Sequence, residues 1–232
     1  MHRLIKTLLV GTLFFLPASI TTADTLAPSP VVIDGTEEVL FGEQQRNSRR
    51  SAVKVHGLQG GHGSGTYIQI DNHALVITAR HVVDRSEIFY VSSASGERVV
   101  GQVVWKSQTK DIAVLKIPRL VTREHVSLQR TGNLDIGNSL VYTGFPASYE
   151  MLTTRATVSG HSSEHGATLL QGFVWFGYSG SGAFDESGKL RAIVVAIAAE
   201  QWQGIPQLLE TVVYTYEISR KDIAEIKEVL GG

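Results

Sequence analysis

Ser179 lies in the middle of a glycine-rich segment, Gly172 to Phe184, in which an apolar run leads into closely spaced glycines. Glycine adopts positive φ angles at little steric cost, so Gly177 and Gly180 allow a sharp turn and direct backbone N–H groups outward. A serine on such a turn can act as a nucleophile, and neighbouring amides can stabilise the oxyanion that its attack creates. Glycine-serine loops without chemistry share this pattern, so the chemistry requires a base from another part of the chain.

His81 and Asp111 are candidate partners for Ser179 because each lies next to a strand-like apolar run. His81 follows the run 74–78, where a buried strand gives way to a turn. Asp111 comes directly before the run 112–117. A carboxylate in this place can accept a hydrogen bond from the imidazole Nδ1–H, which fixes the tautomer whose Nε2 is free to act as a base.

The order of these residues along the chain separates the known types of serine hydrolase. The α/β-hydrolases have the order serine, acid, histidine, and their Gly-x-Ser-x-Gly motif is absent because residue 181 is serine. Subtilisin-type enzymes have the order acid, histidine, serine. The order His81, Asp111, Ser179 fits only the chymotrypsin type.

Six short segments, in order and at similar spacing, resemble motifs of the trypsin-like (chymotrypsin-fold) serine peptidases. The resemblance is to the bacterial branch that includes periplasmic heat-shock proteases and glutamyl endopeptidases, and it covers about residues 51–217. The segments are Gly63-Ser64-Gly65, Thr78-Ala79-x-His81-Val82, Asp111-Ile112-Ala113-Val114-Leu115, Gly144-Phe145-Pro146, Thr157-Val158-Ser159-Gly160 and Gly177-x-Ser179-Gly180.

The resemblance implies a role for each candidate residue. It makes His81 the general base and acid, Asp111 the residue that orients it, and Ser179 the nucleophile, with the amides of Gly177 and Ser179 as the oxyanion hole. Ser181 is also framed by glycines. As nucleophile it would require positive φ at residue 179, which costs a serine more than Gly177.

The resemblance also implies a substrate pocket. In the family, the residue six positions before the nucleophile lies at the base of this pocket, which here is Phe173, and the wall follows Val194, Val195 and Ala196. These residues carry no charge, and an apolar pocket does not compensate a desolvated charge. We therefore expect a polypeptide substrate that is cleaved after small or medium apolar side chains.

Three residues depart from the family pattern. Tyr178 replaces the usual aspartate or asparagine, which excludes activation through the salt bridge of the digestive-type members. Gly182 stands where proline is common, and Arg80 stands where a small residue is common. Because of Tyr178, a second hypothesis stays open: a catalytically silent relative that uses the cleft as a protein-binding module.

The elements that would position these residues are short strands. From Ser51 onward, short apolar runs alternate with glycine, asparagine and aspartate, about one run per dozen residues, which is typical of a β-sandwich or barrel. Together with the resemblance, this predicts an all-β chain of two six-stranded antiparallel barrels. The runs are 52–58, 66–70, 74–78, 88–92, 98–105 and 112–117 in the first half, and 140–145, 152–159, 167–171, 183–184, 190–199 and 211–215 in the second.

The first 23 residues have the pattern of a secretory signal peptide. Arg3 and Lys6 precede an apolar run, and small residues end at Ala23. The run is too short for a membrane span of about 20 residues, and no later stretch offers one. Cleavage removes the two basic residues and takes the formal net charge from −1 to −3, which argues against nucleic acid or an anionic membrane as main partner. With no cysteine, stability must come from an apolar core.

The remaining segments complete the predicted division of the chain. We expect an extended arm that packs on the outside of the body or, equally, a partly disordered linker before residue 51. Ser219 and Asp222 form a capping-box variant, which predicts a C-terminal helix that packs against the second barrel. The predicted division is 1–23 signal peptide, 24–50 arm, 51–119 first barrel, 120–218 second barrel and 219–232 helix.

One further pattern concerns metals. His161, Glu164 and His165 match the spacing of an H-x-x-E-H zinc motif, which requires a helix. Flanking glycines and the lack of a helical apolar stripe favour a solvated loop instead. We therefore expect no metal and no cofactor, and the sequence specifies no oligomeric state.

Overall fold

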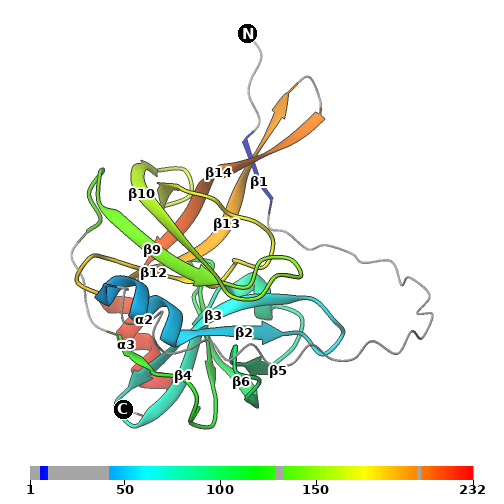
Figure 1. The fold of residues 1–232 in the computed structure, drawn as a ribbon, viewed down its shortest axis with the longest axis vertical. Coiled ribbons are helices and arrows are strands. Elements are labelled where there is room, and N and C mark those ends of the chain that lie inside the picture. Colours follow the sequence, from blue (N-terminus) through cyan, green and yellow to red (C-terminus); the bar gives the residue numbers. More distant parts are fainter. Residues whose placement is uncertain (1–5, 10–41, 129–132, 203–204, 232) are drawn as a thin grey trace.

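The computed structural model describes residues 6–9, 42–128, 133–202 and 205–231. Two β-barrels stand side by side, one made from the first half of the chain and one from the second (Figure 1). Each barrel closes through six antiparallel strands, which confirms the predicted architecture. Apart from residues 6–9 and 42–50, the predicted signal peptide and arm lie outside the described residues. No helix in the described ranges is long and apolar enough to cross a membrane.

The first barrel has the strand order β2-β5-β6-β7-β4-β3, and pairing of β2 with β3 closes it. The bounds are β2 Ala52–His56, β3 His62–Ile70, β4 His73–Thr78, β5 Ile88–Ser92, β6 Arg98–Lys106 and β7 Ala113–Lys116. β3 begins four residues before the predicted run. Its first residues, Gly63 to Gly65, have little intrinsic strand preference, and they are held by β2 on one side and partly by β4 on the other.

The second barrel has the order β13-β12-β9-β10-β11-β14 and closes between β13 and β14. The bounds are β9 Ser139–Gly144, β10 Leu152–Ser162, β11 Ala167–Gln171, β12 Gly182–Phe184, β13 Leu190–Trp202 and β14 Ile205–Glu217. β13 and β14 form a long hairpin that extends beyond the body (Figure 1).

One additional short strand joins each barrel. β8, Val126–Ser127, lies in the connection between the barrels and pairs in parallel with β3. β1, Lys6–Leu9, belongs to the predicted signal peptide and pairs antiparallel with β13, with Leu9 opposite Ile197.

Three apolar clusters hold the molecule together. One fills the first barrel around Val53, Tyr67 and Leu115. Another fills the second barrel around Tyr142 and Tyr178. The third is shared: it joins first-barrel residues such as Ile77 with second-barrel residues such as Val195, and includes Ile226 of the C-terminal helix. The two barrels are therefore packed rigidly enough to hold side chains at their junction.

An N-terminal helix, α2, spans Glu43–Ser51, where the sequence predicted an extended arm. Its buried face is polar, so the sequence shows no apolar stripe from which the helix could be predicted. The Gln44 amide donates to the carbonyl of Phe184 at 2.8 Å, and the Ser48 hydroxyl donates to Thr143 Oγ1 at 2.7 Å. α2 precedes the first barrel but packs on β9 and β12 of the second.

The C-terminal helix, α3, spans Arg220–Val229 and begins with the predicted capping box of Ser219 and Asp222. The prediction that it packs against the second barrel is wrong. Its polar partners belong to the first barrel: Trp105 Nε1 donates to Glu225 at 3.2 Å, and Lys110 Nζ donates to Asp222 at 2.7 Å. The capping box in the sequence identified the start of the helix but carried no information on which barrel it would pack against.

Candidate active site

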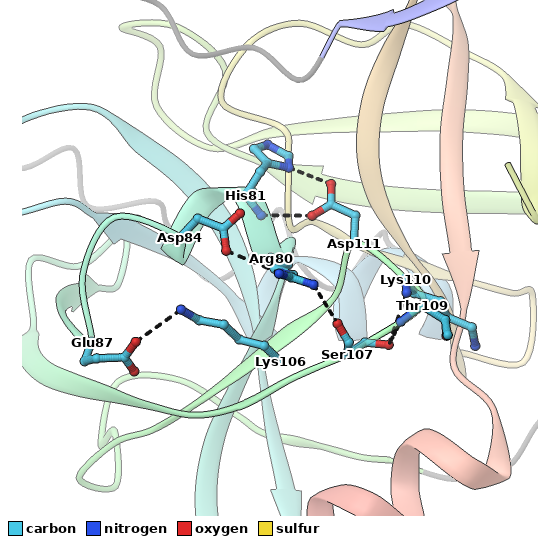
Figure 2. Close-up of polar contacts among 9 residues, drawn as sticks. All are labelled: Arg80, His81, Asp84, Glu87, Lys106, Ser107, Thr109, Lys110 and Asp111. Carbon is cyan, nitrogen blue, oxygen red and sulfur yellow. Dashed lines mark hydrogen bonds and ion pairs between the residues drawn. The ribbon is translucent and has the colours of Figure 1, made fainter.

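His81 lies in a short 3-10 helix, η1, Arg80–Val83, which follows the buried strand β4. Asp111 lies directly before β7, which pairs with β4, so the sheet brings the two residues together. His81 Nδ1 is 2.6 Å from Asp111 Oδ2, and the backbone amide of His81 donates to Oδ1 at 2.9 Å (Figure 2). An ionised carboxylate only accepts, so Nδ1 carries the proton and Nε2 is the free nitrogen. Both side chains are mostly buried.

The loop that carries Asp111 is fixed from two directions. Ser107 Oγ accepts from the amides of Thr109 and Lys110, and the Ser107 carbonyl accepts from Arg80 Nη1 at 3.0 Å (Figure 2). Arg80 also pairs with Asp84 at 3.4 Å. The charge of Arg80 is thus directed toward Asp84 and the loop.

Ser179 comes from the second barrel and meets the first barrel at β3. Its carbonyl accepts from the Ser64 amide at 2.8 Å. Gly63 lies between Ser179 and Val82, the residue after His81: a Cβ at Gly63 would come within 2.9 Å of the Ser179 carbonyl and 2.6 Å of Val82 Cγ2. The Ser179 hydroxyl, which is half-buried, donates to the Val195 carbonyl at 3.3 Å. Ser179 therefore lies where the second barrel meets β3, across Gly63 from the residue that follows His81.

The backbone around Ser179 leaves two amides available. The amides of Tyr178, Gly180 and Ser181 donate to Trp175, Val194 and Tyr178 at 3.1, 2.7 and 2.9 Å. Within the described residues, those of Gly177 and Ser179 donate to no carbonyl. Gly177 has φ +103°, in the region that favours glycine. Two free amides around a serine on such a turn can stabilise a developing oxyanion.

Ser181 lies in a different environment. It is completely buried, and its Oγ has no hydrogen-bond partner in the part of the chain that is described. A buried hydroxyl of this kind has no access to a substrate. The contrast with the half-buried Ser179 favours Ser179 as the reactive serine of the pair.

Tyr178 points into the core of the second barrel. Its side chain is buried, its hydroxyl is 2.9 Å from Thr154 Oγ1, and its ring meets the ring edge of Tyr142 at 5.4 Å. The Tyr142 hydroxyl donates to the Phe173 carbonyl. Burial raises the pKa of the Tyr178 phenol, and the hydrogen bond with Thr154 offsets part of that shift. Tyr178 thus anchors the turn on the side away from the junction.

The residues of the predicted pocket take two different places. Phe173 is 46% exposed, and its ring lies edge-on to that of Tyr178 at 6.3 Å. Val194, Val195 and Ala196 follow one another on β13 with their side chains buried. Only Val195 meets the serine, through its carbonyl.

The H-x-x-E-H residues do not share a helix. His161 lies on β10, whereas Glu164 and His165 lie in the turn after it. The ring of His165 is 5.6 Å from that of Tyr214. The described residues contain no group of three or more histidine, cysteine or acidic side chains that could hold a metal ion.

Ser64 is the residue whose place in the site sequence reasoning missed. It was noted only as part of Gly63-Ser64-Gly65, yet it is completely buried and contacts the turn of Ser179 with backbone and side chain. A polar residue between two glycines at the start of a strand was the available signal.

Comparison with known proteins identifies a family for this chain. The sequence model of the family described as Trypsin-like peptidase domain matches residues 63–193, a range that contains His81, Asp111 and Ser179. The protein named Serine protease Do-like HtrA of Lactobacillus helveticus is 26% identical over 121 residues, 52% of this chain and 29% of that protein. A Bartonella henselae protein named Probable periplasmic serine endoprotease DegP-like is 24% identical over 164 residues, 68% of this chain and 32% of that protein. This chain spans about a third of the length of these curated relatives.

Among solved structures, the serine endoprotease from Yersinia pestis superposes with a TM-score of 0.62 at 20% sequence identity. The superposition covers 81% of this chain and 65% of the other. The shared architecture is the chymotrypsin-like fold of two barrels.

Proposed function

The chain belongs to the trypsin-like peptidase domain family, and from this membership we propose that it is an exported serine endopeptidase. Peptide bonds are hydrolysed through His81, Asp111 and Ser179 with an acyl-enzyme intermediate. The observation that carries the proposal is the 2.6 Å contact between His81 Nδ1 and Asp111 Oδ2 on the first barrel. Ser179 of the second barrel packs on β3 of the same barrel, through the Ser64 amide.

In the proposed mechanism, Ser179 Oγ attacks the scissile carbonyl carbon while its proton passes to His81 Nε2. The hydroxyl must first turn from the Val195 carbonyl toward the imidazole. The amides of Gly177 and Ser179 stabilise the oxyanion of the tetrahedral intermediate. Its collapse breaks the C–N bond, and the leaving amine takes the proton from His81. Water then attacks the acyl-enzyme by the same steps and releases Ser179. Asp111 keeps the imidazole in the tautomer that both half-reactions require.

The proposed specificity is for small or medium apolar side chains before the cleaved bond. It is supported by the lack of charge at Phe173, Val194, Val195 and Ala196, because a buried charge on the substrate would have no partner there. Profiling of cleavage positions on a peptide library tests this. Dominant cleavage after lysine, arginine or glutamate would contradict the assignment of the pocket.

Export is proposed from the signal-peptide pattern of residues 1–23. It is supported by the name of the Bartonella relative, which describes that protein as periplasmic.

One observation favours a second candidate function, a silent relative that binds protein in the cleft. The Ser179 hydroxyl donates to Val195 and not toward the imidazole in this conformation. An enzyme turns that hydroxyl when substrate enters, whereas a binding module has no need to do so.

A fluorophosphonate probe separates the two functions, because covalent labelling requires an activated serine. We expect labelling and turnover to be lost in Ser179→Ala, by at least about 10⁴-fold, and to nearly the same extent in His81→Ala, because members of a triad act as a unit. Ser181→Ala should retain most activity. A melting temperature close to that of the wild type is the control for both catalytic-site variants.

Loss of labelling in Ser181→Ala with retention in Ser179→Ala would move the proposed nucleophile by two residues. A wild-type protein that is folded and unlabelled would support the binding module instead.

A further inference from the structure

Ser64 takes part in four hydrogen bonds, two of which connect the first barrel to the turn of Ser179. Its amide donates to the Ser179 carbonyl at 2.8 Å, and its hydroxyl donates to the Gly177 carbonyl at 2.7 Å. The same hydroxyl accepts from the Phe145 amide at 2.9 Å. The Ser64 carbonyl accepts from Thr78 Oγ1 at 2.6 Å. Three of these four partners belong to the second barrel, and Ser64 lies on β3 of the first.

We propose that Ser64 is a positioning residue that holds the oxyanion-hole turn in its working conformation from the opposite barrel. The expected effect of Ser64 on catalysis rests on the proposed function. Its effect on the conformation of the turn does not. Ser64 touches none of the reacting atoms and acts through the peptide groups of Gly177 and Ser179.

The physical reason lies in the geometry of the trans peptide, in which C=O and N–H point in opposite directions. The Phe176 carbonyl accepts from the Ala147 amide at 2.7 Å, which directs the Gly177 N–H away from Ala147. The Tyr178 carbonyl accepts from the Ser181 amide, which directs the Ser179 N–H of the same peptide group away from Ser181. These two contacts aim the two free amides.

Ser64 fixes the two peptide groups that alternate with them. It binds the carbonyls of Gly177 and Ser179, so four successive carbonyls, from residue 176 to residue 179, have a hydrogen-bond donor. Without the Ser64 hydroxyl, the peptide between Gly177 and Tyr178 loses its side-chain donor. That peptide shares Gly177 with the first free amide, and glycine opposes its rotation least.

The turn also lies so close to Ser64 that residue 180 has no room for a side chain. Gly180 has φ +97°, and a Cβ at this position would collide with the Ser64 carbonyl and with Thr78 Oγ1. The nucleophile turn therefore packs its backbone directly on β3. The conformation of the turn depends on how the two barrels dock.

The test compares Ser64→Ala with Ser48→Ala. Both serines are buried and both donate one hydrogen bond across to the second barrel, at 2.7 Å in each case, but Ser48 contacts Thr143 on β9 and not the turn. We expect Ser64→Ala to lower kcat about 10- to 100-fold, with KM changed less than about twofold, because the amides it positions act mainly in the transition state. Ser48→Ala should leave both constants unchanged.

A second measurement does not require activity. In Ser64→Ala, amide hydrogen exchange of a peptide covering residues 176–181 should become about 5- to 10-fold faster, the change expected for the loss of one hydrogen bond. In Ser48→Ala the exchange of this peptide should not change. Ser64→Cys, which keeps a weak donor, should give intermediate exchange and kcat, and it replaces Ser64→Ala if that variant does not fold.

The outcomes separate this inference from the proposed function. Faster exchange at 176–181 in a protein that the fluorophosphonate never labels would support the role of Ser64 and contradict the enzyme. An enzyme whose Ser64→Ala variant keeps wild-type kcat and wild-type exchange at 176–181 would overturn the role of Ser64. A fall in kcat that Ser48→Ala shares to the same degree would also overturn it, since the effect would then be general loosening.

Discussion

Tyr178 stands directly before the proposed nucleophile, at the position where the sequence excludes activation through the salt bridge of the digestive-type members. Its phenol bonds to Thr154, and its ring packs between the edges of Tyr142 and Phe173. The turn is thus held on one side by an aromatic group in the second barrel and on the other by Ser64. An ordered turn in the resting state is expected from this arrangement, without a new N-terminus to complete it.

The contribution of the ring and of the hydroxyl can be separated by two substitutions. Tyr178→Phe removes only the hydrogen bond to Thr154 and should lower the free energy of unfolding by about 1 kcal/mol, or about 2–4 °C in melting temperature. Tyr178→Asn introduces the residue type that the resembled family uses, but it removes a buried ring and should cost about 3–5 kcal/mol. We expect Tyr178→Phe to keep most activity.

Thermal denaturation of both variants measures this difference, with Tyr149→Phe as control because Tyr149 is exposed. If Tyr178→Asn were as stable as Tyr178→Phe, the ring would not anchor the turn.

At the scale of elements, the strands were the most predictable part. Residues 88–92 and 167–171 form strands with the predicted bounds, because each is an apolar or β-branched run closed by turn residues. Others extend further than their apolar runs. β14 begins at Ile205, six residues before the predicted start, because β13 supplies partners for residues 205–209 and pairing outweighs local preference.

The helices show where sequence pattern stops being informative. α3 has a capping box and an apolar face, and both features are visible in the sequence. α2 has neither an apolar face nor a side-chain cap, and its stability comes from polar contacts that only the folded second barrel provides. Contacts between distant segments, such as those of Gln44 and Ser64, cannot be deduced from local periodicity.

The candidate site divides in the same way. The pairing of His81 with Asp111 could be predicted because each lies next to an apolar run, and these runs form the paired strands β4 and β7. The roles of His81, Asp111 and Ser179 stay a prediction. The direction of the Ser179 hydroxyl and the hydrogen bonds of Ser64 could not be predicted, because they depend on how two barrels meet. The barrels meet through the shared apolar cluster around Ile77 and Val195. The sequence of neither barrel alone shows which of its apolar residues belong to this cluster.

At the scale of the whole molecule, each α-helix of the described residues packs on the barrel that is farther from it in the sequence. α2 precedes the first barrel and packs on the second, whereas α3 follows the second barrel and is bonded to the first. α2 and α3 therefore each link the two barrels through packing. The direct connection along the chain between the barrels is residues 117–138. Because the proposed site lies at the junction, anything that loosens α3 should affect both stability and the loop of Asp111.

The contact that carries this coupling is the ion pair of Lys110 with Asp222. Lys110 is the neighbour of Asp111, and its ammonium donates to Asp222 Oδ2 at 2.7 Å and to the Glu217 carbonyl at 2.8 Å. Asp222 is 4% exposed. Burial alone would raise its pKa, but hydrogen bonds from Lys110 and Ser219, together with the charge of Lys110, outweigh burial and lower the pKa of this carboxyl.

A lowered pKa in the folded state fixes the direction of the pH effect. Below the ordinary aspartate pKa of about 3.9 the unfolded chain binds more protons at this residue than the folded chain does. The contribution of Asp222 to stability is therefore present above that pH and is lost as the pH falls through the folded-state pKa. Asp222→Asn cannot lose this contribution, so its stability should fall less steeply in acid.

We expect Asp222→Asn to lower the free energy of unfolding at pH 7 by about 2 kcal/mol, because it leaves the partly buried Lys110 without its counter-ion. The matched control is Asp71→Asn, at the other end of α3, where the pair with Lys227 is exposed at 3.1 Å and should contribute less than about 1 kcal/mol. Urea unfolding of the three proteins from pH 7 down to pH 3 measures both effects. The stability difference between wild type and Asp222→Asn should shrink as the pH falls, whereas that for Asp71→Asn should stay small throughout. Two outcomes would contradict the role of Asp222 in holding α3 to the loop of Asp111. One is an equal loss of unfolding free energy in the two variants at pH 7, and the other is a stability difference between wild type and Asp222→Asn that does not change with pH.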